Sequence, residues 1–81
     1  MALEVYRIKN YVDLSGKGHN ILYCLLADQN GYGVAVVDAG RERAEVRDLT
    51  PDRARAEGLL SLLSANLVTP CALRDVVEDW L

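Results

Sequence analysis

The spacing of apolar residues changes at Thr50-Pro51-Asp52, and this change limits the possible folds more than any other feature of the chain. Before that point apolar residues form continuous runs or alternate with polar ones, as in β-strands. After it they recur at intervals of three and four residues, as on one face of an α-helix. We therefore expect a single domain over residues 1–81, with a strand half at about 3–49 and a helical hairpin at about 51–81.

The strand half contains four segments that are separated by turn-forming residues. The expected strands are Leu3 to Val12, Ile21 to Ala27, Tyr32 to Ala39 and Arg41 to Leu49. The second segment is apolar almost throughout, which is typical of a central strand covered on both faces, or on one face by the chain and on the other by a partner. Asn30-Gly31 follows it and predicts a hairpin with a type I′ turn. In the last segment Ala44 and Val46 alternate with charged residues, which indicates an edge or solvent-facing strand.

The helical half begins with a capping pattern. Thr50 is the expected N-cap, with Pro51 at the first helical position and Asp52 near the positive end of the helix dipole. We expect this helix to end at about Ala65, with Asn66 as a left-handed C-cap. Its expected buried stripe consists of Ala56, Leu59, Leu60 and Leu63.

A second Thr-Pro pair predicts another helix from about residue 70. Its apolar face has no gap and consists of Leu73, Val76, Val77, Trp80 and Leu81. Gly58 suggests that another element approaches the first helix closely, because glycine inside a helix costs about 1 kcal/mol relative to alanine. Short connections between neighbouring elements favour an α+β fold, namely a four-stranded antiparallel meander followed by two helices packed on one face of the sheet.

Composition and charge argue against several classes of protein. The chain has 81 residues, of which 51% are hydrophobic, so it is not a disordered tail. It has no run of about 20 apolar residues that would span a membrane. Arg41, Arg43 and Arg47, with Tyr32 nearby, invite a nucleic-acid interpretation, but acidic residues interleave with them and the pI is about 4.9. A DNA-binding helix-turn-helix is rejected because the exposed face of the last helix is acidic.

Asp75, Glu78 and Asp79 share one face of the last expected helix. Such a cluster suits a divalent cation, an arginine-rich partner or simply solvent. The arginines at positions 41, 43, 47, 53 and 55 also need partners, so we single out acid–base complementarity within one chain or between two chains.

Few residues are available for site chemistry. Cys24 and Cys71 form no CxxC pair and His19 is the only histidine, so we expect no metal and no cofactor. Both cysteines lie in apolar runs and are expected to be small core residues, the alternative being a disulfide between them.

The segment Ser15-Gly16-Lys17-Gly18-His19 has the residue types of a phosphate-binding loop but not its spacing. We expect a hairpin loop over residues 13–20 in which the glycines supply positive φ. His19 is expected to be a solvated loop residue, because nothing in the sequence fixes Ser15 or Asp13 against it. Without a convergent acid, base and nucleophile, we expect no enzyme.

The second half also carries a set of residues at characteristic positions. They are Val46-Arg47-Asp48-Leu49, Asp52, Leu60, Leu63, Asn66-Leu67-Val68-Thr69-Pro70 and Leu73-Arg74-Asp75-Val76-Val77-Glu78-Asp79-Trp80-Leu81. In these the chain resembles a family of small uncharacterised bacterial proteins that is classed as a domain of unknown function. Ala72 departs from the polar residue that often precedes the leucine of the last helix in that family. The resemblance implies an α+β domain with no known activity and provides no catalytic residues.

These observations favour a cytoplasmic, non-enzymatic interaction or regulatory module. No basic segment leads into an apolar one near Met1, so a secretory signal is not expected. A single helical layer leaves one sheet face with Leu22, Cys24 and Leu26, which predicts a homodimer or an unknown protein partner. The expected interaction surface comprises Arg41, Arg43, Arg47, Tyr32, Asp75, Glu78 and Asp79. The alternative is a small-molecule-binding domain with a pocket between sheet and helices.

Overall fold

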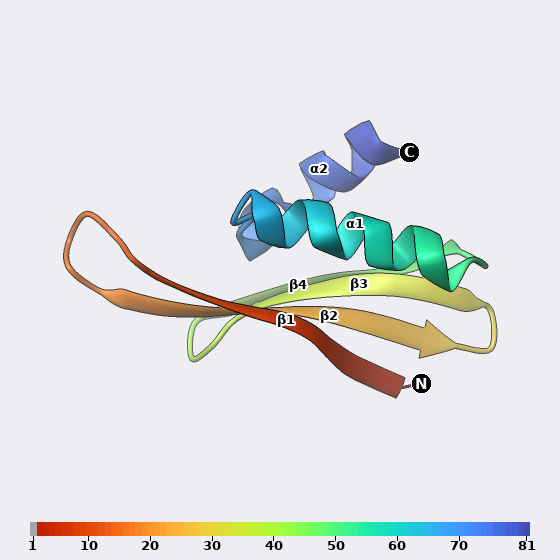
Figure 1. Cartoon of the computed structure of the whole chain (residues 1–81), viewed down its shortest axis with the longest axis horizontal. Helices are drawn as coiled ribbons and strands as arrows, with labels where there is room; N and C mark the ends of the chain where they lie inside the picture. The colour runs from red at the N-terminus through yellow and green to blue at the C-terminus, as the bar shows by residue number, and fades with distance from the viewer. Residues whose placement is uncertain (1) are drawn as a thin grey trace.

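The computed structural model describes residues 2–81 as one antiparallel sheet followed by two helices (Figure 1). The strands are β1 (Ala2–Val12), β2 (Gly18–Asp28), β3 (Gly31–Asp38) and β4 (Glu42–Thr50), and they lie in the sheet in chain order. The helices are α1 (Arg53–Ala65) and α2 (Leu73–Trp80), and the short 3-10 turn η1 (Pro70–Ala72) precedes α2. The predicted α+β meander is confirmed, and β1 and β4 are its two edges.

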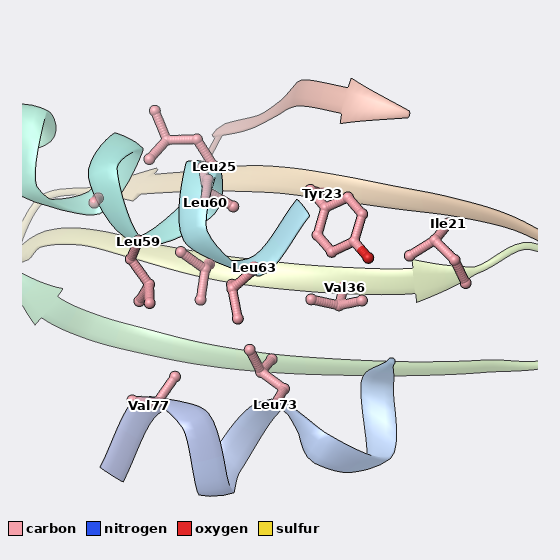
Figure 2. Packing of buried hydrophobic residues seen from close by; sticks show 11 residues of the cluster. Ile21, Tyr23, Leu25, Val36, Leu59, Leu60, Leu63, Leu73 and Val77 are labelled. Atoms are coloured by element: carbon pink, nitrogen blue, oxygen red, sulfur yellow. The ribbon is translucent and has the colours of Figure 1, made fainter. Parts of the chain in front are cut away.

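The main core lies between the helices and one face of the sheet (Figure 2). β2 and β3 contribute every second residue, as the two-residue period of a strand requires. α1 contributes the stripe that the sequence predicts, so the helical period is confirmed. The buried members are Ile21, Tyr23, Leu25, Val34, Val36, Ala56, Leu59, Leu60, Leu63, Leu73 and Val77. Removal of these side chains from water holds both helices on the same side of the sheet.

The β2–β3 hairpin forms where predicted, but its turn is not of type I′. Gln29 and Asn30 connect the paired residues Asp28 and Gly31, and neither connecting residue has a positive φ. The Asp28 carboxylate accepts hydrogen bonds from the Asn30 and Gly31 backbone N–H groups at 2.8 and 3.2 Å. This side-chain cap favours a turn in which glycine follows the connecting residues instead of being one of them.

A bulge in β4 ends the predicted alternation of faces. Residues 47–49 stand opposite Gly33 alone, and Asp48 has a φ of 54°. A Cβ on Gly33 would lie 2.8 Å from the Cα atom of Arg47, so only glycine fits beneath the bulge. Beyond it Leu49 packs against the main core, whereas strict alternation would place it with the outward-facing charges.

α1 begins later than the Thr-Pro pair predicts. Thr50 still belongs to β4, and Asp52 is the N-cap, whose carboxylate accepts a hydrogen bond from Ala54 N at 2.9 Å. Asn66 follows the last turn with a φ of −102°, so it is not a left-handed cap. The positive φ, 49°, falls on Leu67. Thr50 pairs with Tyr32 at the end of β4, and its Oγ1 atom accepts a hydrogen bond from Asp52 N at 3.1 Å, so the chain leaves the sheet before the helix begins.

Three further expectations about the helical half are wrong. A Cβ on Gly58 would meet no atom within 4 Å, so none of the elements that the structure describes packs closely against it. Cys71 is exposed in η1, whereas Cys24 is buried as expected, and both thiols are free. Leu81 follows the end of α2 and is 77% exposed, so the buried apolar face stops at Trp80.

The other face of the sheet carries no helix, and we call it the helix-free face. Its residues include Leu3, Val5, Ile8, Leu22, Cys24, Leu26, Ala35, Val37, Arg43 and Glu45. Its centre, formed by Cys24, Leu26 and Ala35, is buried by neighbouring side chains of the sheet. Along β1, by contrast, Leu3, Val5 and Ile8 are 48%, 47% and 55% exposed. Exposed apolar surface is therefore concentrated on an edge strand.

No helix within residues 2–81 is long and apolar enough to cross a membrane.

Candidate functional site

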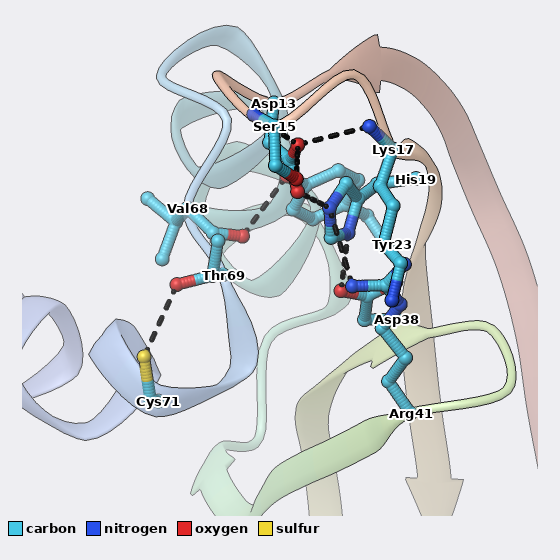
Figure 3. Close-up of polar contacts among 10 residues, drawn as sticks. All are labelled: Asp13, Ser15, Lys17, His19, Tyr23, Asp38, Arg41, Val68, Thr69 and Cys71. Atoms are coloured by element: carbon cyan, nitrogen blue, oxygen red, sulfur yellow. Dashed lines mark hydrogen bonds and ion pairs between the residues drawn. The ribbon is translucent and has the colours of Figure 1, made fainter.

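His19 lies between two carboxylates on the part of the β1–β2 hairpin that extends beyond the helices (Figures 1 and 3). Its Nδ1 atom is 2.9 Å from Asp38 Oδ2, and its Nε2 atom is 2.7 Å from Asp13 Oδ2. The Tyr11 ring stacks on the imidazole with the ring centroids 4.6 Å apart. His19 is only 9% exposed, so the prediction of a solvated loop histidine is wrong.

The register of the hairpin explains this burial. β1 and β2 pair as far as Val12 and Gly18, so the loop is shorter than predicted and His19 belongs to β2. The loop then turns back through Asp13, whose Oδ1 atom accepts hydrogen bonds from Ser15 N, Ser15 Oγ and Lys17 N. This local network fixes the Asp13 carboxylate against the ring, and no pattern in the sequence predicts it.

The two carboxylates favour a charged imidazolium that carries a hydrogen on both ring nitrogens. The hydrogen bond to Asp13, and then that to Asp38, raise the pKa of His19 above its usual value of 6.5. Arg41 Nη1 lies 3.4 Å from His19 Nε2, and its positive charge opposes this increase with a smaller effect. The pKa of Asp13 is lowered, first by the Ser15 hydroxyl and then by His19.

The hydrogen bonds of this cluster link the β1–β2 loop to β2 and β3. Its groups are not ordered as in a catalytic triad. A triad needs a nucleophile that donates its hydrogen bond to the histidine, but Ser15 Oγ donates to Asp13 at 2.6 Å. Both ring nitrogens face carboxylates, so His19 has no free lone pair for a metal. Within residues 2–81 no group of three or more His, Cys, Asp or Glu side chains is arranged to hold a metal ion.

The arginines of the predicted interaction surface occupy different places. Arg43 and Arg47 both bind the Glu45 carboxylate, at 3.0 and 2.9 Å, along the edge of β4. Arg41 lies in the β3–β4 turn beside His19. Tyr32 packs against the main core on the helix side, so it does not join the arginines on the helix-free face. Sequence reasoning missed Glu45 as their partner, although alternation places it between them on the same side of the strand.

The acidic residues of the predicted surface lie elsewhere again. Asp75, Glu78 and Asp79 are exposed on α2 and form no ion pair within residues 2–81. The arginines of α1 contact other segments of the chain: Arg53 binds Glu4 of β1 at 2.7 Å, and the Arg55 guanidinium lies over the Trp80 ring of α2 at 4.9 Å. Among residues 2–81, the predicted ion pairs between the arginines and the acidic residues of the last helix are therefore not formed.

Two depressions lie between the sheet and the helices, where the alternative prediction places a ligand. One, of about 210 Å³, is lined by Glu4, Val5, Tyr6, Leu25, Arg53 and Glu57. The other, of about 150 Å³, lies between β4 and α2. Both are smaller than the roughly 300–1,000 Å³ that is typical of small-molecule sites.

Comparison with known proteins identifies the family but no characterised relative. No curated protein and no solved structure matches the chain significantly. The model of a family of unknown function, DUF6514, matches residues 4–81, which include the whole of the four-stranded sheet from Glu4 onward and both helices. The chain therefore belongs to the DUF6514 family.

Proposed function

We propose that the protein is a non-enzymatic interaction module whose partner is a second copy of itself. The observation that carries the proposal is the row of exposed apolar side chains on β1, namely Leu3, Val5 and Ile8. They lie on an edge strand whose outer side pairs with no other strand within residues 2–81. Such an edge is a template for pairing with another chain, and large exposed apolar side chains gain from being covered.

The two edges of the sheet differ in a way that supports β1 as the interacting side. β4 carries the charged Arg43–Glu45–Arg47 network and a bulge at Asp48, and both features discourage pairing with another strand. β1 also has a bulge and charged residues, but it is longer than β4 and it carries the apolar row. The centre of the helix-free face is already buried within one chain, so the apolar surface left for a partner is confined to the β1 side of that face.

The non-enzymatic part of the proposal is supported by the chemistry of the His19 cluster. The His19 ring is hydrogen-bonded to the Asp13 and Asp38 carboxylates, and the Ser15 hydroxyl donates its hydrogen bond to Asp13 and not to His19. The depressions between sheet and helices are small, so we place a small-molecule ligand second to a protein partner. A bacterial, cytoplasmic setting stays a prediction from the sequence.

Sedimentation equilibrium of three chains at micromolar concentration tests the proposal. The unmodified chain is expected to have twice the mass of one 8.9 kDa chain. Ile8→Lys places a charge in the apolar row and should give monomers. Leu62→Lys is the matched control, because Leu62 is 44% exposed on α1 and away from β1, and this variant should remain dimeric. A monomeric unmodified chain, or equal dimerisation of all three, would overturn the proposal.

A further inference from the structure

The bulge in β1 determines how two copies of this strand can meet. β1 pairs with β2 up to Val5, skips one residue and resumes at Arg7. As a result Tyr6 and Arg7 lie on the same side of the sheet. Tyr6 packs against the main core, and Arg7 Nη1 donates a hydrogen bond to Ser64 Oγ of α1, so this shared side is the helix side.

The remaining β1 residues alternate on either side of the bulge. Glu4 and Lys9 lie on the helix side, since they are paired in register with the core residues Leu25 and Ile21. Val5 and Ile8 lie on the helix-free face, since they are paired with Cys24 and Leu22. Leu3 and Asn10 lie on that same face.

Directly paired residues of antiparallel strands point to the same face, and this rule restricts the register of two β1 strands. When the two-fold axis passes between Tyr6 and Arg7, every residue from Ala2 to Tyr11 meets a partner residue on its own side of the sheet. A shift of the axis by half a residue, or by one residue toward the N-terminus, places Val5 opposite a residue of the other side. A shift by one residue toward the C-terminus instead places Arg7 opposite the partner's Ile8, which lies on the other side. The two bulges also face each other in this register, so neither strand has an unmatched extra residue.

The same register is chemically self-complementary. It sets Glu4 opposite Lys9 of the partner subunit, Val5 opposite the partner's Ile8, and Tyr6 opposite the partner's Arg7. The two-fold axis repeats each of these pairs, so a dimer contains two ion pairs, two apolar pairs and two arginine–aromatic pairs. Glu4 is 59% exposed although it binds Arg53, and Lys9 forms no ion pair within residues 2–81, so both are available.

We propose that two copies pair through antiparallel β1 strands about an axis between Tyr6 and Arg7, forming a continuous sheet with the helices of both copies on one side. This inference rests on the proposed self-association and specifies its geometry. Charged residues on an edge normally prevent pairing. In this register, however, the charges attract, so Glu4 and Lys9 favour one partner strand, the copy in register, over others.

Charge reversal tests the register through the dimer Kd measured by sedimentation. Glu4→Lys and Lys9→Glu should each weaken dimerisation by about 10-fold, because each places two like-charged cross-strand pairs in the dimer. The double variant Glu4→Lys/Lys9→Glu restores opposite charges and should return the Kd to within about threefold of the original. An equimolar mixture of the two single variants should form heterodimers preferentially, because both cross-strand pairs are then of opposite charge.

Two controls separate the register from other causes. Asp79→Lys changes the net charge as Glu4→Lys does, but on α2, and should leave the Kd unchanged. Arg53→Gln removes the intrachain partner of Glu4 and should not weaken the dimer. If the unmodified chain dimerises and the double variant stays as weak as the single ones, the register is wrong while self-association stands. If the unmodified chain is monomeric, both proposals fail.

Discussion

Replacing Gly58 by alanine should stabilise the protein, because Gly58 lies in the middle of α1 with no neighbour that requires its small size. A Cβ built on Gly58 meets no atom within 4 Å, and its φ is not in the positive range. Alanine restricts the unfolded chain more than glycine does and is favoured in a helix interior by about 1 kcal/mol. For a domain of this size, that increase in the free energy of unfolding raises the Tm by about 4–8 °C.

Gly33→Ala is the matched control, because the same added methyl group should have the opposite effect there. At Gly33 the new Cβ would lie 2.8 Å from Arg47 Cα and would also contact the Val46 carbonyl oxygen. Both contacts are with backbone, so β4 would have to move, at a cost of about 1–3 kcal/mol or more.

Urea unfolding followed by circular dichroism measures both changes in the free energy of unfolding. The experiment should be done with the protein at one fixed concentration, since self-association also stabilises the folded state. A Gly58→Ala variant with unchanged or lower stability would show that the added methyl group is not free of contacts, and would indicate that another chain packs against this side of α1. A Gly33→Ala variant as stable as the original would show that β4 does not bulge over Gly33.

Two further predictions concern the His19 cluster and the thiols. The pKa of His19 is raised on folding, so its stabilising contribution is complete below about pH 6.5 and is lost as the pH rises through the higher folded pKa. Urea midpoints of the original chain should therefore fall as the pH rises from 6.5 through that folded pKa, and this fall should be absent in His19→Gln. The pKa of Asp13 is lowered on folding, so its contribution to the free energy of unfolding is present above the usual pKa of 3.8 and is lost in more acidic solution. In the same titration, this loss of stability at acidic pH should be absent from Asp13→Asn. A thiol reagent should modify the exposed Cys71 within minutes in the folded protein, but Cys24 only on unfolding, because Cys24 is buried and burial raises the pKa of its thiol. Mass spectrometry of the two cysteine-containing peptides measures the two modification rates, and equal rates would contradict the structure.

Much of the fold follows from local patterns in the sequence, and the differences have identifiable causes. The period change at residue 50 and the stripe of α1 are properties of consecutive residues, so they are visible without a structure. The start of α1 was misjudged because Thr50 has a competing role in the sheet. The turn after β2 was misjudged because the Asp28 side chain selects a turn type that Asn-Gly alone does not indicate.

The His19 cluster could not be predicted in the same way, because it depends on register between strands. Asp13 and His19 are close in sequence, but Asp38 reaches the ring only through the pairing of β2 with β3. A one-residue slip would turn His19 to the other face of the sheet. The same holds for β1, where the bulge between Val5 and Arg7 decides which residues share a face.

Hydrogen–deuterium exchange of β1 at different protein concentrations tests the central claim most directly. If β1 is the self-associating edge, the amides of Ala2–Val12 that point away from β2 should exchange slowly at concentrations above the dimer Kd and rapidly on dilution below it. The amides of β4, Glu42–Thr50, should exchange at a rate that does not depend on concentration. Exchange of β1 that is the same at every concentration, or protection that develops in β4 instead, would contradict the account.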